Sequence, residues 1–304
     1  MTAPLPPPPT QNRLLGIGLR IGATASIGCM AASIKLGHEA GINTPELIFY
    51  RFALGLPPML AWMALTREFG AWRSRRPLAQ IGRAALGLAT MSFVFSTLYY
   101  LPLAEATTIG FAAPLFSVIL SALILSEAVG RHRWSAVAIG FAGVLIVMQP
   151  SGSHLPPIGL ALALMAALGV ATVTITIRQI GKTEGTLTTV LWFTAFSMIA
   201  TGLFLPFYGE AHDARQWLIL VALGLSGGLG QLFLTSSLRF APVSVVVPFD
   251  YVQLLWAVLL GWLLWDTHPL ATTWAGASVI IASGLYTIYR EHKLGRDKAP
   301  AATF

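Results

Sequence analysis

The sequence predicts an all-α integral membrane protein with ten transmembrane helices, built as two inverted five-helix repeats. Composition is the first observation behind this prediction. Of the 304 residues, 55% are hydrophobic and 10% are charged, with a mean hydropathy of +0.71, whereas soluble domains carry roughly 25% charged residues. The second observation is that the apolar runs approach the ~20 residues that a helix needs to cross about 30 Å of hydrocarbon.

An internal repeat is the third observation, and it sets the architecture. The segment 103–149 reappears at 240–289 as a long apolar run, an acidic residue, a short polar break, a Trp and a second apolar run. Aligning the two segments places Glu127 on Asp266, Pro114 on Gln253 and, after one inserted residue, Trp134 on Trp274. The chain therefore contains two copies of one unit.

The apolar runs define ten expected spans, in chain order. They cover residues 14–36, 45–65, 81–101, 106–125, 134–148, 158–177, 187–208, 217–238, 242–265 and 271–289. The intervening breaks are short, so they leave no room for a soluble catalytic domain.

These spans divide the chain into four parts. The parts are a disordered tail at 1–13, a first repeat at 14–149, a second repeat at 158–289 and a basic cytoplasmic tail at 290–304. The Pro-rich N-terminus lacks the basic region and the small-residue cleavage site of a signal peptide, so we expect the first span to direct insertion itself.

The distribution of Lys and Arg predicts the orientation, because cytoplasmic loops are enriched in these residues. With the N-terminus inside, nearly all basic residues between the spans fall on the cytoplasmic side, and only Lys35 and Arg215 fall outside. Both termini are therefore predicted to be cytoplasmic, in a cell inner (plasma) membrane. Five spans is an odd number, so the second repeat enters the bilayer from the opposite face. Inverted repeats of this kind recur in secondary transporters, with substrate held near the midplane.

Two charged residues lie deep within the expected spans. Arg51 follows the outer entry of the second span by about 9 Å and Asp250 follows the inner entry of the ninth by about 12 Å, at ~1.5 Å per residue. Charges at such depth are costly and mark functional sites. We expect both to face an interior cavity and to be coupled, either directly or through substrate. The alternative is a buried pair that only fixes helix register.

Two prolines interrupt the corresponding spans of the two repeats. Pro248 removes the backbone hydrogen bond to Ser244 just before Asp250, and broken helices in transporters tend to lie at the binding site. Pro114 frees the carbonyl of Gly110 in a run that is already polar at Thr107. A kink beside a cavity and a harmless kink satisfied by hydroxyl side chains both remain open for Pro114.

Uncharged polar groups give further candidates for the substrate site. Gln231 and Gln253 can hydrogen-bond in two directions and are candidates for substrate recognition. Tyr99 and Tyr100 close the third span, either as an aromatic anchor at the interface or as a gate. Gly224 and Gly228 are expected to let helices approach closely.

Other charged residues are expected near the membrane surfaces. Arg20 and Lys35 lie near the ends of the first span, where long side chains snorkel to water. Glu127 is expected to join a cytoplasmic ion cluster.

Enzyme and cofactor signals are absent from the sequence. There is no HExxH, no Walker loop and no clustering of His or Cys, and Cys29 is the only cysteine. We therefore predict no catalytic residues, no metal site and no cofactor. The net charge of +7 reflects membrane topology and not nucleic-acid binding. The expected partners are a small-molecule substrate and the lipid bilayer, and a homodimer is left open.

Three stretches resemble the ten-span EamA-type transporters of the drug/metabolite transporter superfamily. They are YYLPLAEATTIGFAAPLFSVILSALILSE, RWSAVAIGFAGVLIVMQP and RFAPVSVVVPFDYVQLLWAVLLGWLLWDTHP. The likeness is greatest to the branch that includes bacterial riboflavin and S-adenosylmethionine uptake transporters. It implies a carrier of small organic metabolites with a central cavity between the repeats. Asp266 stands where the second repeat of the family usually carries Glu.

The resemblance favours uptake of a vitamin or cofactor, such as riboflavin or S-adenosylmethionine. Relatives that export amino acids or toxic compounds leave export as the alternative. A non-transporting membrane scaffold is the alternative from another class, and an intramembrane enzyme is disfavoured because no acid/base or metal cluster is present.

Overall fold

The computed structural model describes residues 12–124, 129–149, 155–181 and 183–297, and within these ranges it contains helices and no strands. The helices of the first half are α1 (Arg13–Glu39), α2 (Thr44–Ala53), α3 (Leu56–Thr66), α4 (Pro77–Tyr100), α5 (Leu103–Gly110), α6 (Ala113–Ile124) and α7 (Arg131–Met148). Those of the second half are α8 (Pro157–Ile180), α9 (Thr186–Gly202), α10 (Leu205–Tyr208), α11 (Ala214–Phe240), α12 (Val243–Val246), α13 (Val252–Trp265) and α14 (Ala271–Asp297). Two 3₁₀ segments, η1 (Phe69–Trp72) and η2 (Val247–Tyr251), complete the described elements.

Most of these helices have the length and composition of membrane spans. Among the described residues, eight helical segments are long and apolar enough to cross a bilayer, and α9 is a shorter apolar helix. The expectation of a multi-pass, all-helical membrane protein is therefore confirmed. α7 has 18 residues and begins with Arg131, His132 and Arg133, and it is not among the eight segments.

Four of the expected spans are interrupted, the seventh of them between α9 and α10 at Leu203 and Phe204. In the other three, α2 gives way to α3 at Leu54 and Gly55, α5 to α6 at Phe111 and Ala112, and α12 to α13 through η2. The break between α2 and α3 packs against Gly224 and Gly228 on α11, where an added Cβ at Gly228 would lie 2.8 Å from the Gly55 carbonyl oxygen. The close helix approach expected at these two glycines is confirmed.

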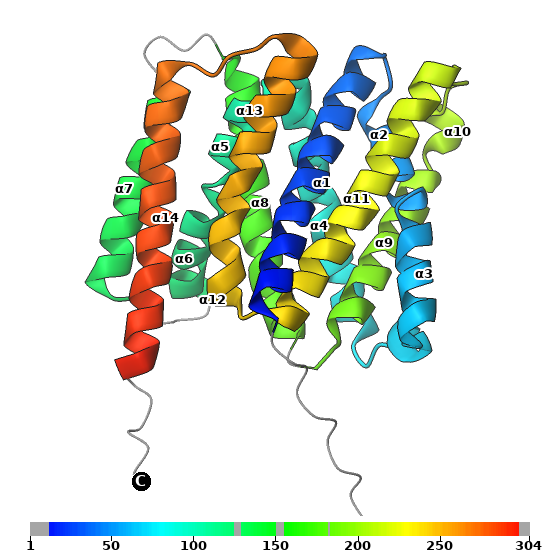
Figure 1. The fold of residues 1–304 in the computed structure, drawn as a ribbon. Coiled ribbons are helices and arrows are strands. Elements are labelled where there is room, and N and C mark those ends of the chain that lie inside the picture. The colour runs from blue at the N-terminus through cyan, green and yellow to red at the C-terminus, as the bar shows by residue number, and fades with distance from the viewer. Residues whose placement is uncertain (1–11, 125–128, 150–154, 182, 298–304) are drawn as a thin grey trace, which may run out of the picture.

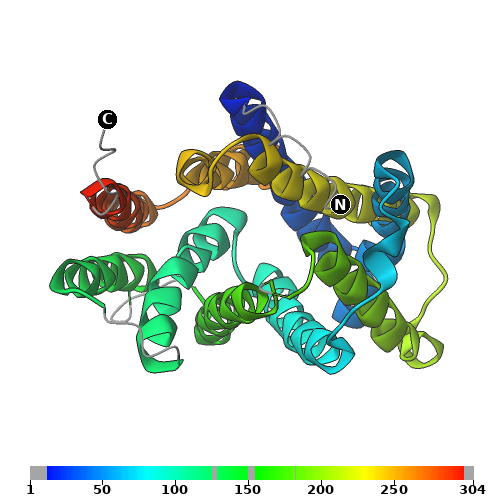
Figure 2. The same cartoon turned by 90° about the horizontal axis from the view of Figure 1, so that it is seen from below.

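The helices stand in two rows when the molecule is viewed along their axes (Figure 2). One row contains α14, α13, α1 and α11, and the other contains their counterparts α7, α6, α8 and α4. Within the rows α1 packs on α11 and on α13, and α8 packs in the same way on α4 and on α6. Each row therefore combines helices from both halves of the chain.

Corresponding helices of the two halves run in opposite directions. In Figure 1, α1 rises from the lower end of the molecule, whereas α8 descends from the upper end. Likewise α7 rises and α14 descends, so the start of α1 and the end of α14 lie at the same end of the bundle. The two halves are thus related by an approximate two-fold axis that is perpendicular to the helices.

The contact between α7 and α14 obeys this two-fold relation residue by residue. Gly143 packs against Gly276, with an added Cβ at Gly143 lying 2.9 Å from the Gly276 carbonyl oxygen. The alignment that places Trp134 on Trp274 maps this pair onto Ser283 and Ala136, and the Ser283 hydroxyl donates to the Ala136 carbonyl oxygen at 2.6 Å. The contact is isologous, meaning that the same surface serves both partners.

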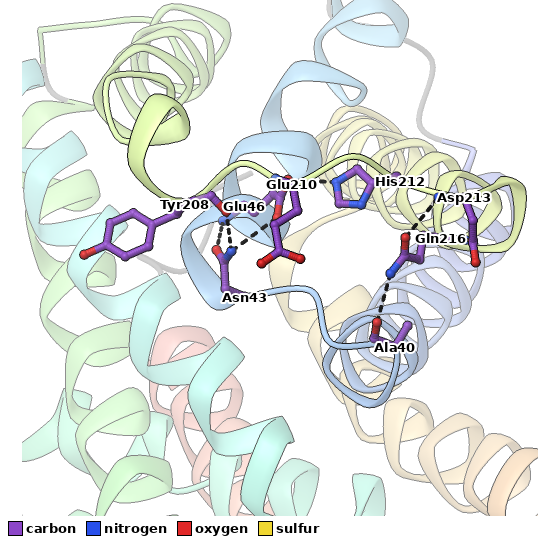
Figure 3. Close-up of polar contacts among 8 residues, drawn as sticks. All are labelled: Ala40, Asn43, Glu46, Tyr208, Glu210, His212, Asp213 and Gln216. Carbon is purple, nitrogen blue, oxygen red and sulfur yellow. Dashed lines mark hydrogen bonds and ion pairs between the residues drawn. The ribbon is translucent and has the colours of Figure 1, made fainter.

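The upper end of the bundle is fastened by polar contacts between the two halves (Figure 3). His212 Nε2 lies 2.7 Å from Glu46 Oε1, where both side chains are almost fully buried. The Asn43 side-chain amide donates to the Tyr208 carbonyl oxygen at 2.7 Å, and the Gln216 amide donates to the Ala40 carbonyl oxygen at 2.9 Å. Together these contacts hold the loop before α11 on the connection between α1 and α2.

Candidate functional site

A cavity of about 250 Å³ lies between the two rows of helices. Its walls come from α1, α4, α5, α8 and α13, and thus from both halves of the chain. Most of the lining is apolar, and its polar side chains are Thr97, Thr107 and Gln253. A mostly apolar cavity with a few polar groups is the usual form of a small-molecule site. The structure therefore places two of the predicted site residues, Thr107 and Gln253, at the cavity.

The wall on the side of the second half is continuous with the broken segment η2. Pro248 has no N–H to donate, so a regular helix cannot continue through it, and residues Val247–Tyr251 form a 3₁₀ turn. Asp250 lies in this turn, three residues before the cavity residue Gln253. Tyr251 packs edge-on against the cavity residue Phe111, with ring centroids 5.1 Å apart.

Asp250 forms an ion pair with Arg20. The Nε and Nη2 groups of Arg20 each donate to one carboxylate oxygen of Asp250, which gives a bidentate pair. The Arg20 side chain is 9% exposed and that of Asp250 is 35% exposed. The pair bridges α1 of the first half and η2 of the second.

This pair corrects two expectations. The direct pairing of Asp250 with Arg51 is wrong, because Arg20 occupies the carboxylate, and Arg20 does not extend to water as a snorkelling residue does. The depths explain the outcome. Arg20 is seven residues into α1, or about 10 Å from its start, which is level with Asp250 approached from the same end. Lys35, the other residue expected to snorkel, is half-buried and donates to the Leu101 carbonyl oxygen at 3.4 Å.

Arg51 instead belongs to a cluster that we call the arginine column, formed by Arg51, Phe52, Phe193 and Arg83. The guanidinium of Arg51 lies 4.4 Å from the centre of the Phe52 ring, and that of Arg83 lies 4.2 Å from the centre of the Phe193 ring. The two rings meet edge to face with centroids 5.0 Å apart. Arg51 is 5% exposed and Arg83 is 7% exposed. The column joins α2, α4 and α9.

The remaining predicted residues lie away from the central cavity. Tyr99 and Tyr100 are exposed at the upper end of α4, and Tyr99 packs edge-on against His38 at 5.4 Å. Gln231 lines a hollow of about 640 Å³ between α3, α9 and α11. Pro114 follows the break between α5 and α6 and lines another hollow, near Ser117. Glu127 lies outside the described residues.

Four buried charged residues were missed at the sequence level: Glu46, Arg83, Glu105 and Glu184. Arg83 was counted with the cytoplasmic residues because it is only the third residue of the expected span 81–101, next to the membrane surface, but α4 begins at Pro77 and takes Arg83 into its second turn. Glu105 was placed just outside the fourth span, yet it is 4% exposed and accepts a hydrogen bond from Thr273 at 3.0 Å. Proline is favoured at the first position of a helix, so Pro77 could have marked the start of this span. Arg83 would then have been recognised as a residue within it.

Comparison with known proteins matches this arrangement to a transporter family. The EamA-like transporter family matches residues 14–149 and 157–289, and so covers both repeats. A solved crystal structure superposes on 90% of this chain and 97% of its own with a TM-score of 0.63, at 20% identity. That likeness supports the fold alone.

Curated relatives with similar sequences carry transporter names. A riboflavin transporter of Vibrio cholerae is 28% identical over 95% of this chain and 96% of its own length. A pseudopaline exporter of Pseudomonas aeruginosa is 27% identical over 88% of this chain and 94% of its own. An S-adenosylmethionine uptake transporter of Rickettsia prowazekii is 26% identical over 83% and 85%, respectively. These names include both uptake and export.

Proposed function

Because the chain belongs to the EamA-like transporter family, we propose that it is a secondary carrier that moves a small organic metabolite across the bacterial inner membrane by alternating access. Uptake of a vitamin or cofactor, such as riboflavin or S-adenosylmethionine, is the first candidate. The cavity between the two rows carries this proposal, because both repeats contribute to its walls. A site of this kind can open to either side when one half rocks against the other.

The proposed topology has ten spans with both termini in the cytoplasm. Eight segments qualify by length and composition, and α9 and α7 complete the number because they are the counterparts of α2–α3 and α14 in the repeat. In Figure 1 the segment between α3 and α4 and the start of α7 lie at the lower end, whereas the end of α1 and the start of α11 lie at the upper end. The former carry Arg73, Arg76 and Arg131, and the latter carry Lys35 and Arg215. The positive-inside rule then assigns the lower end to the cytoplasm.

The pair of Arg20 and Asp250 is the proposed coupling element. It joins α1 to η2, which belong to opposite halves, and it lies on the segment that leads into Gln253. A rocking motion that separates these halves on the cytoplasmic side must lengthen or break the pair. Substrate binding or protonation of Asp250 would lower the cost of that separation.

Flux into vesicles of known orientation tests the proposal. Reconstituted wild-type protein should show saturable uptake of riboflavin or S-adenosylmethionine, and Asp250→Asn should abolish it. Since Asp250→Asn leaves Arg20 buried without a partner, the double variant Arg20→Leu/Asp250→Leu serves as a folded comparison. Full flux in the double variant would reduce the pair to a structural role. Saturable efflux without uptake would favour export, the direction in the name of the pseudopaline relative.

A scaffold without transport is the rival from another class. Truncation before Lys293 separates the two, since a scaffold that depends on its basic tail should fail whereas a carrier should retain flux. Absence of flux for every solute, together with partner capture that requires the tail, would replace the carrier proposal.

A further inference from the structure

The arginine column holds two positive charges without a counter-charge. In the part of the chain that the structure describes, no carboxylate forms an ion pair with Arg51 or Arg83. Nε of Arg51, and Nε and Nη1 of Arg83, are buried donors without a hydrogen-bond acceptor. Both groups are positive and belong to one connected cluster through Phe52 and Phe193, so they repel each other. Both charges are therefore buried, unpaired and mutually unfavourable.

The aromatic rings do not offset this arrangement. A desolvated cation–π contact is weaker than the cost of burying a guanidinium, and each buried unpaired donor adds to that cost. The rings fix the positions of the two guanidinium groups, but they leave the charges uncompensated. Ionisable groups kept at such a cost within membrane spans mark functional sites.

The unpaired donors define the chemistry of the missing group. A guanidinium presents a planar fork of N–H donors that fits the oxygens of a carboxylate or phosphate in a bidentate manner. We propose that Arg51 and Arg83 bind the anionic oxygen group, carboxylate or phosphate, of the molecule that this carrier transports. This inference rests on the proposed function, and it restricts the substrate to small metabolites that carry such a group. Of the two named candidates it retains S-adenosylmethionine, which has a carboxylate, and excludes riboflavin, which has neither a carboxylate nor a phosphate.

Met30 lies next to both the arginine column and the central cavity. A Cβ added to Gly227 would lie 3.2 Å from Arg51 Nε and 3.2 Å from Met30 Sδ, so Met30 and Arg51 adjoin the same point. Met30 also lines the cavity. Methionine is unbranched and adapts its shape readily, so a rotation of Met30 gives a substrate access to Arg51. The apolar body of the substrate would occupy the cavity, between Thr107 and Gln253, and its anionic group would reach past Met30.

Anion binding to the intact protein gives the first test. Full-length protein in detergent would be heated with sodium succinate, inorganic phosphate or sodium chloride at constant ionic strength. We expect succinate or phosphate to raise the melting temperature in a saturable manner, because a ligand that binds the folded state stabilises it. Arg83→Met should raise the melting temperature in the absence of anion and weaken the anion response about tenfold or more. The exposed Arg73→Met is the matched control and should respond as the wild type does.

Each contrary result overturns the proposal. A response to chloride alone would indicate a simple counter-ion. Equal responses in Arg83→Met and Arg73→Met, or no saturable response in the wild type, would remove the column as an anion receptor. A lower melting temperature of Arg83→Met with an unchanged anion response would indicate a packing role.

Flux of matched solutes separates this proposal from the function on which it rests. Vesicles would be assayed with riboflavin 5′-phosphate against riboflavin, and with tryptophan against tryptophanamide. We expect Arg83→Met to lower the flux of the anionic or carboxylate member about tenfold relative to its partner, and Arg73→Met to leave the ratio unchanged. Flux with an unchanged ratio would retain the carrier and reject the receptor. Anion binding that depends on Arg83 without flux of any solute would reject the carrier and the assignment to a transported substrate.

Discussion

Two regions of the molecule bury arginines to a similar extent but in opposite ways. At the seam between the halves, Arg20 meets Asp250 in a bidentate pair. In the arginine column, Arg51 and Arg83 meet only the rings of Phe52 and Phe193. In the first region the charges of Arg20 and Asp250 cancel, whereas the second region carries two uncompensated positive charges. Their difference indicates that the protein itself supplies the counter-charge at the seam, and that a ligand supplies it in the column.

This comparison assigns different tasks to the two regions. A matched pair between halves can be broken and formed again without a ligand, so it suits a moving contact. An unmatched pair within α2, α4 and α9 gains its partner only when an anion enters. Stability measurements on substituted proteins can test the contrast directly.

The largest effect is expected when the ion pair of Arg20 and Asp250 loses one partner. Arg20→Leu leaves Asp250 at depth without a counter-charge and should lower the free energy of unfolding by about 3 kcal/mol, the low end for a broken buried pair, because the Asp250 side chain is 35% exposed. Arg20→Leu/Asp250→Leu should recover to within about 1 kcal/mol of the wild type. Denaturant titration in mixed micelles measures both, and a double variant no better than the single one would contradict the pairing.

A smaller loss is expected when a ring of the column is removed. Phe193→Leu removes the cation–π contact with Arg83 and the edge-to-face contact with Phe52. It should lower the free energy of unfolding by about 1 to 2 kcal/mol. The same substitution in an Arg83→Met background should cost less, because the cation–π part is already absent. Equal costs in the two backgrounds, measured by the same titration, would show that the ring does not support the guanidinium.

A gain in stability is expected when the column loses a charge. Arg83→Met should raise the free energy of unfolding by about 1 kcal/mol without anion, since an apolar side chain of similar length replaces an unpaired buried cation. Arg51→Met should act likewise, and the double variant should gain less than the sum, because the mutual repulsion is removed only once. Additive gains would indicate that the two charges do not interact.

The smallest effect is expected for the surface. Arg73→Met, in the exposed break between η1 and α4, should change the free energy of unfolding by no more than about 0.5 kcal/mol. A larger change would mean that the gains expected in the column reflect net charge and not burial.

Most of the architecture could be predicted from the sequence because it depends on patterns that run along the chain. Apolar runs of bilayer length located the helices, and the repeat of 103–149 at 240–289 predicted the relation between the halves. Proline chemistry located the interruption of the helix around Pro248, since a missing N–H acts on its own helix. These properties require no knowledge of neighbouring helices.

The candidate site could be predicted only in part, because its pairings depend on which helix faces which. Thr107 and Gln253, which were predicted to belong to the substrate site, line the central cavity, and their role in binding stays a prediction. The expected depths of Arg51 and Asp250 in the membrane allowed a contact between them. The partner of Asp250 is nevertheless Arg20 on α1, which lies at the same depth as Asp250. Arg83 escaped notice because an error of four residues at the start of α4 moved it from the second turn of the helix to the first, where it was counted with the cytoplasmic residues.

The isologous contact of α7 with α14 has a consequence for the first half of the protein by itself. Residues 13–149 alone would expose the Gly143 surface, and only a copy inserted in the reverse sense could cover it antiparallel. Charge bias directs every copy of one sequence to insert the same way, so identical halves could not assemble this contact in a membrane. The second half supplies the reversed copy through its own distribution of arginines, and fusion into one polypeptide keeps the ratio of the two orientations at one to one.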